Sequence, residues 1–556
     1  MLVRRVTQYI STHATVSSTV SQSSRHFSKT SVPRPRRSSR LKLIFGGIFV
    51  SASGLGYFTL HGGDDNDHAT KPRTPLSTLL RSYCVFAMCS IPPLVDKSPA
   101  ILDVLTSIPG IRQLTYVFVR NTFFNQFVGG DTPQDCVPLL KQLCAENKGG
   151  ILTYSVEVGQ ATSTETTQEG RARVKDIVRE TIQSIDAVAN TMDAQPATTG
   201  DRSLWIAIKL TGLVPHTQSL TNLSIHLTNS RKSSHLSTHI PYPGCPMSSE
   251  LDFLIEGTTP TGSTLTVQDI SDLRELYADL EQICMHCKKR GVKILIDAEH
   301  SWFEPAIDAM GLSLMRKFNS PSDTTNSSPL PLVYVTFQAY LRRNKDYLIR
   351  SLEDAKAENY SLGVKLVRGA YQALEIQQHK LAKGDTDTQL SLSISPESQL
   401  PTWSTKLETD QCYNDCIRIL ISALHEDIVD SHNPHVGIMF GTHNSDSCEL
   451  ILEELVRYGL AKISDIGVIT IPPEVSNRMT IAQLYGMSDV LSESLVARTR
   501  TQSPLVVKSI PYGALSEVMP YLSRRAIENK SVLGQGKAVA ERKRAGEEIW
   551  RFFFRE

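Results

Sequence analysis

The sequence predicts an α/β protein in which a (β/α)8, TIM-like barrel follows a helical N-terminal region. Three observations support this prediction. Eight short, nearly continuous apolar runs occur after Gly149, segments with helical periodicity separate them, and most of them end in a polar or ionisable residue. Apolar runs rich in β-branched residues are typical of strands buried on both faces of a parallel sheet. A doubly wound open sheet is the alternative, but eight such strands over this length favour a closed barrel.

The composition limits the class of protein. The chain has 556 residues, of which 40% are apolar and 21% are charged, as in ordinary globular proteins. Its formal net charge of +1 gives no reason to expect a nucleic acid as partner. The ten cysteines are spread over the chain, which favours reduced, buried thiols over a disulfide framework.

Residues 1–42 predict a mitochondrial transit peptide. No Asp or Glu occurs between Met1 and Gly63, and arginines alternate with many Ser and Thr. Such a start is typical of transit peptides, whereas the alternative is a disordered basic tail. Residues 43–73 then form an apolar segment and a polar linker. The apolar part, Leu43–Leu60, is barely long enough to span a bilayer, so a membrane anchor, a sorting signal and part of a cleaved region all stay open.

The sequence predicts a helical region over residues 74–149 and the barrel over residues 150–556. Apolar residues recur at helical spacing in "SPAILDVLTSIPGI" and "TPQDCVPLLKQLCAENKGG", and the second stretch ends at a Gly-Gly stop. The predicted strands are residues 151–157, 204–210, 292–299, 332–338, 364–369, 436–443, 479–486 and 505–510.

The carboxyl ends of these strands carry the candidate site residues. In a (β/α)8 barrel the active site lies at that end. One polar residue there is expected of any strand that leaves the core, but polar groups from six strands indicate a binding site. These residues are Glu157, Lys209, Asp297, Gln338, Arg368, Thr442 and His443, with Gln483 inside the seventh strand.

Cationic groups outnumber anionic groups among the candidates. The cations are Lys209, Lys365, Arg368, His443, Arg524 and Arg525, and the anions are Glu157, Asp297 and Glu528. An excess of positive charge suits a carboxylate or a phosphate. Adjacent residues on a helix point about 100° apart, so Arg524 and Arg525 could hold a carboxylate from two sides. Neither a GxGxxG nor a GxxxxGK[ST] nucleotide loop occurs in the sequence, although a cofactor held by barrel loops stays possible.

Six motifs, in order, resemble those of the proline dehydrogenase family of flavin-dependent enzymes. They are "ILIDAEHSWFEPAID", "VYVTFQAYLRR", "VKLVRGAYQALE", "FGTHNSDS", "AQLYGMSD" and "PYGALSEVMPYLSRRAIENKSVL". The resemblance implies a distorted barrel that binds FAD and oxidises L-proline to Δ1-pyrroline-5-carboxylate. It also implies that electrons pass to ubiquinone on the matrix side of the inner mitochondrial membrane.

The resemblance implies roles for the substrate-side residues. Arg524 and Arg525 would bind the proline carboxylate, and Glu528 would fix one guanidinium by an i,i+3 or i,i+4 pair. The other implied residues of this group are Lys209 near the carboxylate, Asp297 as an orienting group and Tyr371 near the substrate ring.

The resemblance also implies a set of cofactor-binding residues and no metal ion. The set is Gln338, Lys365, Arg368, Thr442, His443, Asn444 and Gln483. Whether Lys365 or Arg368 lies near flavin N5 stays open, because bacterial members carry Arg and Lys at these positions in the opposite order. The lone "CMHC" (284–287) has no second pair of ligands, so a buried structural pair is expected there.

One position departs from the family pattern. Members usually have Tyr two residues before the Pro of "PYG", where this chain has Ser509. Either the pocket is looser, or Tyr512 fills the volume, or the substrate preference is altered towards hydroxyproline. A non-catalytic barrel that binds a flavin or a small acid, and a barrel of the methylenetetrahydrofolate reductase type, are further alternatives. The C-terminal "IWRFFFRE" could touch a membrane interface, but packing against the barrel is the expected use.

Overall fold

The computed structural model describes residues 75–155, 167–194, 203–233, 240–258, 265–321, 330–384, 391–429, 436–531 and 537–554. All of them belong to one compact unit, Ala69–Glu556. The predicted transit peptide and Leu43–Leu60 lie outside the described residues. Within the described ranges, no helix is both long and apolar enough to cross a membrane.

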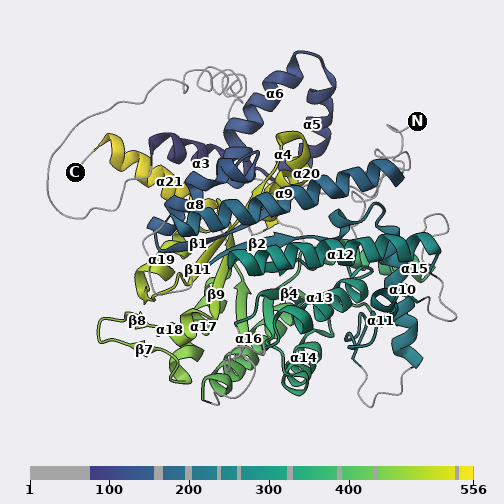
Figure 1. Ribbon diagram of the computed structural model, residues 1–556. Coiled ribbons are helices and arrows are strands. Elements are labelled where there is room, and N and C mark those ends of the chain that lie inside the picture. Colours follow the sequence, from purple (N-terminus) through teal and green to yellow (C-terminus); the bar gives the residue numbers. More distant parts are fainter. Residues whose placement is uncertain are drawn as a thin grey trace, which may run out of the picture. The chain divides into compact units, whose positions relative to one another are not determined.

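Eight parallel strands close the barrel (Figure 1). Around the barrel their order is β1, β11, β9, β6, β5, β4, β3 and β2. They are β1 (Lys148–Tyr154), β2 (Leu204–Ile208), β3 (Lys293–Ile296), β4 (Val333–Gln338), β5 (Gly363–Val367), β6 (Gly437–Gly441), β9 (Met479–Leu484) and β11 (Val506–Tyr512). The eight predicted strands and the closed barrel are therefore confirmed. The first strand begins at Lys148 rather than at Ile151, because Lys148 already pairs with Val506.

Helices between the strands cover the outside of the barrel. They are α9 (Thr167–Asp193), α10 (Gln218–Ser233), α11 (Asp252–Glu256), α12 (Val267–Arg290), α13 (Glu304–Phe318), α14 (Asn344–Glu358), α15 (Gln372–Ala382), α16 (Lys406–Val429), α17 (Ser445–Arg457), α18 (Pro473–Ser476) and α19 (Asp489–Arg498), with the short 3-10 helix η2 (Leu210–Leu213). A small sheet of β7 (Lys462–Ile463), β8 (Ile469–Thr470) and β10 (Thr499–Arg500) was not predicted. Its strands are two residues long, too short to give a periodic signal.

The predicted helical region precedes the barrel. Its helices are α3 (Leu76–Cys89), α4 (Pro92–Asp96), α5 (Ser98–Ser107), α6 (Ile111–Val119), η1 (Arg120–Phe124), α7 (Asn125–Phe127) and α8 (Pro133–Ala145). Helix α8 packs on β1, β11 and α9, where a regular barrel has the helix that follows its last strand. That helix, α20 (Leu515–Ser531), packs instead on α3, α4 and η1. This exchange is the distortion of the barrel, and we call α3 to α7 together with α20 the helical cap.

Side chains from the strands fill the barrel lumen. They are Ile151, Trp205, Ala207, Leu295, Tyr334, Met439, Ala482 and Val507. The Tyr334 ring meets Trp205 edge-on at a centroid distance of 4.7 Å. A Cβ at Gly437 would lie 2.2 Å from the Tyr334 hydroxyl, so this ring requires glycine on the facing strand. Because alternate strand residues point to opposite faces, the lumen-facing set also shows which neighbours face the outer helices.

The C-terminal helix α21 (Lys537–Phe553) packs along α3 through a face that includes the buried Ala545. Its aromatic end does not share this contact. The side chains of Trp550, Phe552, Phe553 and Phe554 are between 49% and 63% exposed. The expected packing of "IWRFFFRE" against the barrel is therefore wrong for these four residues.

Candidate active site

Strands β3 and β5 bring an aspartate and a lysine together, since Asp297 directly follows β3 and Lys365 is the third residue of β5. Lys365 Nζ lies 2.6 Å from Asp297 Oδ1, and each side chain is only 17% exposed. The backbone N–H of Asp297 donates to Ile208 O at 2.9 Å, which continues the ladder between β2 and β3. The strands therefore hold this ion pair at the carboxyl end of the barrel. Both residues were predicted for the site, but their pairing was not.

Gln338, at the end of β4, has a fixed amide orientation. Its Nε2 donates to Glu299 O at 3.2 Å. A carbonyl oxygen can only accept, so the amide nitrogen must face Glu299 and Oε1 is the atom left to accept from another group. The side chain is 3% exposed, which limits the orientations it can adopt.

We call the carboxyl end of the barrel the rim. Glu299 was not predicted as a site residue, yet it links several elements of this rim. Its carboxylate accepts the Thr211 backbone N–H at 3.0 Å and the Thr211 hydroxyl at 2.5 Å. Burial raises the pKa of Glu299, and the nearby charge of Lys209 opposes this rise. Lys209 likewise opposes the rise that burial causes in the pKa of Tyr521 on α20. The Lys209 ammonium is thus within electrostatic range of both the rim and the helical cap.

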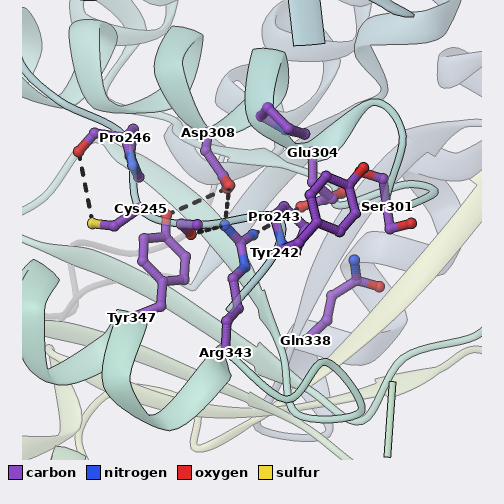
Figure 2. Close-up of polar contacts among 12 residues, drawn as sticks. Tyr242, Pro243, Cys245, Pro246, Ser301, Glu304, Asp308, Gln338, Arg343 and Tyr347 are labelled. Carbon is purple, nitrogen blue, oxygen red and sulfur yellow. Dashed lines mark hydrogen bonds and ion pairs between the residues drawn. The ribbon is translucent and has the colours of Figure 1, made fainter. Parts of the chain in front are cut away.

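A buried ion network supports the segment that contains Glu299 (Figure 2). Arg343 Nη1 lies 2.6 Å from Asp308 Oδ2, and Arg343 Nη2 lies 3.6 Å from Glu304 Oε2. Glu304 Oε1 in turn accepts the backbone N–H of Glu299 at 2.6 Å. Burial raises the pKa of Glu304, and the neighbouring Asp308 charge raises it further, while Arg343 opposes both effects.

Tyr371 connects the rim to α20, which carries Arg524 and Arg525 and which we call the arginine helix. Its ring centroid lies 4.1 Å from that of His300, which stacks in parallel on Trp302 at 4.3 Å. On another side, the guanidinium carbon of Arg524 lies 6.0 Å from the Tyr371 centroid. Gly369 lies two residues before Tyr371. Its φ of +112° and its closeness to the Tyr340 ring exclude a side chain at position 369.

Helix α20 places Arg525 in a different direction from Arg524. Arg525 is 5% exposed, its Nη2 lies 2.5 Å from Glu528 Oε1, and its guanidinium lies 4.9 Å from the Tyr521 ring centroid. Of the two pairings left open for Glu528, the structure forms the i,i+3 pair with Arg525. The buried Tyr521 hydroxyl has no hydrogen-bond partner among the described residues. A buried donor without a partner is expected where a ligand supplies the acceptor.

Arg368 lies outside the lumen, on the side of the helices. Its three nitrogens donate to Asp410 Oδ1 at 2.6 Å, Thr442 Oγ1 at 3.0 Å and Ser447 Oγ at 2.8 Å. The guanidinium also lies 4.2 Å from the Tyr413 ring centroid. Three of its five N–H donors are therefore occupied by residues of α16, α17 and the end of β6. Of the pair left open, Lys365 and not Arg368 shares the rim with Asp297.

The "THN" segment fixes the start of α17. Asn444 Oδ1 accepts the Ser447 N–H at 2.9 Å, and Thr442 Oγ1 accepts the Asn444 N–H at 3.0 Å. His443 Nε2 accepts the Leu484 N–H at 3.2 Å, and its Nδ1 lies 3.0 Å from Ser488 Oγ. Because a backbone N–H can only donate, His443 must be the tautomer that carries its proton on Nδ1. These residues lie together at the carboxyl ends of β6 and β9.

The side chains of Gln483 and Tyr512 point away from the other predicted site residues. Ala482 faces the lumen, so its neighbour Gln483 faces α19, where Oε1 accepts from Ser492 and, at 3.4 Å, from Lys508. The Tyr512 hydroxyl lies 2.6 Å from Ser184 Oγ on α9. The idea that Tyr512 fills the space left by Ser509 is therefore wrong. Glu157 lies outside the described residues.

Comparisons with known proteins agree on one family. The family model described as "Proline dehydrogenase" matches residues 140–538. A mitochondrial proline dehydrogenase 2 of Arabidopsis thaliana is 30% identical over 471 residues, which are 83% of this chain and 85% of that protein. A hydroxyproline dehydrogenase of Mus musculus is 28% identical over 474 residues, 85% of this chain and 91% of that protein.

A solved structure shares the fold. The crystal structure of proline utilization A from Bdellovibrio bacteriovorus, inactivated by N-propargylglycine, matches with a TM-score of 0.53 and 16% sequence identity. The match covers 82% of this chain but only 40% of that one, so this chain corresponds to part of the larger protein. At this identity the likeness supports the barrel alone.

Proposed function

This chain belongs to the proline dehydrogenase family, and from that membership we propose that it oxidises L-proline to Δ1-pyrroline-5-carboxylate with FAD bound at the barrel rim. The observation that carries the proposal is the arginine helix. Arg524 faces Tyr371 of the rim, while the buried Arg525 is held by Glu528 beside Tyr521. Two guanidinium groups that approach from different directions suit a small carboxylate.

The rim residues fit a flavin. The isoalloxazine ring offers an N–H donor between two carbonyl acceptors, and Gln338 Oε1 is a fixed acceptor at the end of β4. Lys365 adds a cation that Asp297 holds in place. We assign Gln338, Lys365 and the 442–444 segment to the cofactor, with Lys365 rather than Arg368 near flavin N5. When bound, the flavin would supply the two-electron chemistry that none of the protein's own side chains can perform.

The remaining groups orient the substrate. Arg524 and Arg525 hold the carboxylate, Lys209 adds positive charge near it, and Tyr371 and Tyr521 pack on the ring. Oxidation removes a hydride from C5 and a proton from the ring nitrogen, which leaves a C=N bond. A carboxylate clamped on both sides keeps C5 in one position, and such positioning lowers barriers by several kcal/mol.

Anaerobic titration of the purified protein tests the proposal. The protein should show an oxidised flavin spectrum that L-proline bleaches, and denaturation should release FAD. Release of FMN would refute the cofactor assignment. A flavin that proline cannot bleach would leave a non-catalytic flavin-binding barrel.

Hydroxyproline is the second candidate substrate, because Ser509 is on the lumen side of β11. Val507 of the same strand faces the lumen, and residues two apart share a face. A serine there leaves room that a tyrosine would fill. The ratio of kcat/KM for hydroxyproline to that for proline decides between the two substrates. Ser509→Tyr should move this ratio towards proline by about tenfold if the open volume selects hydroxyproline.

We further propose that residues 1–42 direct import of the protein into mitochondria. The enzyme then acts at the matrix face of the inner membrane, with ubiquinone as electron acceptor. Two proline dehydrogenases of Arabidopsis thaliana that resemble this chain are named mitochondrial. The exposed aromatic end of α21, next to Arg551, suits a membrane interface. Deletion of residues 2–40 should leave the protein in the cytosol, and a quinone analogue should reoxidise the reduced flavin.

A further inference from the structure

The His300 imidazole contacts two aromatic rings at the rim. It stacks in parallel on the Trp302 indole, at a centroid distance of 4.3 Å and an interplanar angle of 5°, and its centroid lies 4.1 Å from that of Tyr371. Trp302 is 2% exposed, so its indole is fixed in the barrel core, whereas Tyr371 is half-buried. His300 therefore joins a buried ring to one that faces the site.

Hydrogen bonds tie the backbone around His300 to the helix that begins at Tyr371. The Glu375 carboxylate accepts the Ser301 N–H at 2.7 Å and the Ser301 hydroxyl at 2.5 Å. Ser301 O accepts the Tyr242 hydroxyl at 2.7 Å. The N–H of Glu375 donates to Tyr371 O at 3.0 Å, in the first turn of α15. The same turn thus carries the tyrosine and the carboxylate that anchors the segment beside it.

The contact between His300 and Tyr371 depends on the ring of the histidine and not on its nitrogens. The buried Nδ1 has no hydrogen-bond partner among the described residues. Glu375 Oε1 lies 3.7 Å from it, which is too far for a hydrogen bond, and this oxygen already accepts from Ser301. Contact between aromatic rings stabilises a pair beyond the area that it buries and requires no charge.

We propose that His300 is a positioning residue that acts through Tyr371, because its ring holds the tyrosine ring where it packs on the ring of the substrate. The inference rests on the proposed function, which assigns Tyr371 to the substrate ring and Arg524 to the carboxylate. The guanidinium carbon of Arg524 lies 6.0 Å from the Tyr371 centroid. A displaced Tyr371 ring therefore weakens the grip on a cyclic substrate and leaves the carboxylate clamp in place.

Binding to the full-length holoprotein, followed by the flavin absorbance, tests the role of the ring. The probe is tetrahydrofuran-2-carboxylate, a cyclic carboxylate whose ring oxygen replaces the nitrogen, so that it cannot be oxidised to an imine. His300→Leu should raise its Kd about three- to tenfold, as expected for the loss of one aromatic pair. His300→Phe keeps the stack and should stay within about twofold of the wild type. An equal loss in both variants, or none in His300→Leu, would overturn the proposal.

Two controls separate positioning from a general distortion of the site. His425 lies 5.4 Å from the Tyr458 ring near the C-terminal ends of α16 and α17, which are the helix ends remote from the rim. His425→Leu removes a similar pair there and should leave the Kd unchanged. Acetate has a carboxylate but no ring, so its Kd should change less than about twofold in His300→Leu. A loss for acetate as large as for the cyclic probe would refute positioning through Tyr371.

A double variant tests whether His300 acts through Tyr371. If it does, the variant that combines His300→Leu with Tyr371→Leu should bind the cyclic probe no more weakly than Tyr371→Leu alone. Additive losses would contradict this route and leave the proposed function untouched. A wild type that binds the cyclic probe, but whose flavin L-proline does not bleach, would refute the proposed function alone.

Discussion

The barrel rim and the helical cap contribute to one site from two different cores. Lys365, Asp297 and Gln338 stand on strands whose outer faces belong to the large barrel core. Tyr521 and its helix belong to a smaller core that α20 shares with α3 and η1. The groups that we assign to the cofactor are therefore stabilised by one part of the molecule, and the arginines that we assign to the substrate are stabilised by another. Substitutions in the cap should therefore raise the KM for proline, whereas substitutions of buried barrel residues should change stability without raising that KM.

The largest effect is expected from the cap. Arg525→Met should raise the KM for proline and leave FAD bound, because we propose that this guanidinium holds the substrate and not the cofactor. Removing one partner of a buried ion pair costs about 3–5 kcal/mol, or roughly two to four decades of kcat/KM. Steady-state kinetics and the flavin absorbance measure the two quantities separately. Normal proline kinetics in both Arg525→Met and Arg524→Met would refute the carboxylate assignment.

On the barrel side, a substitution in the buried ion network should lower the free energy of unfolding. Arg343 is 2% exposed between Asp308 and Glu304, so Arg343→Met leaves two buried carboxylates without their cation. Urea denaturation should show a loss of about 3–5 kcal/mol in the free energy of unfolding. Arg350→Met, which breaks an exposed pair with Asp354, is the matched control and should cost about 0.5 kcal/mol or less. An equal loss in both variants would show that the buried network does not support the rim.

A pair of leucine truncations separates the two cores. Leu280 of α12 is fully buried in the barrel core, and Leu522 of α20 is 4% exposed in the cap core. Each Leu→Ala change should cost about 2–5 kcal/mol of unfolding free energy, since each leaves a cavity. Only Leu522→Ala should also raise the KM for proline, because it loosens the helix that carries the arginines. Similar KM values in the two variants would contradict the division of the site.

The two regions also differ in how well the sequence predicts them. The strands were predicted because buried parallel strands give continuous apolar runs, and the polar residues at their ends then follow from the geometry of a barrel. Single positions were predicted less well. Arg368 and Gln483 face the outer helices, which the alternation from Lys365 and Ala482 could have shown once the lumen side was known.

Glu299 and His300 were missed as site residues, although both occur in a motif quoted for the family. Their roles depend on partners far away in the sequence, Thr211 for Glu299 and Tyr371 for His300. Nothing in the local pattern indicates such contacts. The packing of α20 on the cap, rather than on the barrel wall, likewise depends on which apolar face finds a partner, and one sequence does not reveal this.

The smallest effect is expected from the titration of Glu299 on the barrel side. Burial raises its pKa, so between the ordinary carboxyl value of about 4.3 and the raised folded value the unfolded chain releases a proton that the folded chain keeps. Stability from this group is thus present at low pH and is lost as the pH rises across that window. Glu299→Gln removes the ionisable group and should flatten this part of the curve of Tm against pH. Its gain over the wild type on the alkaline side should be about 1 kcal/mol or less, because Lys209 and Thr211 already favour the charged form. Glu353→Gln, at an exposed position of α14, removes the same charge as a control and should leave the curve unchanged. A Glu299→Gln variant whose curve keeps the wild-type slope would show that burial does not hold a proton on this carboxyl group.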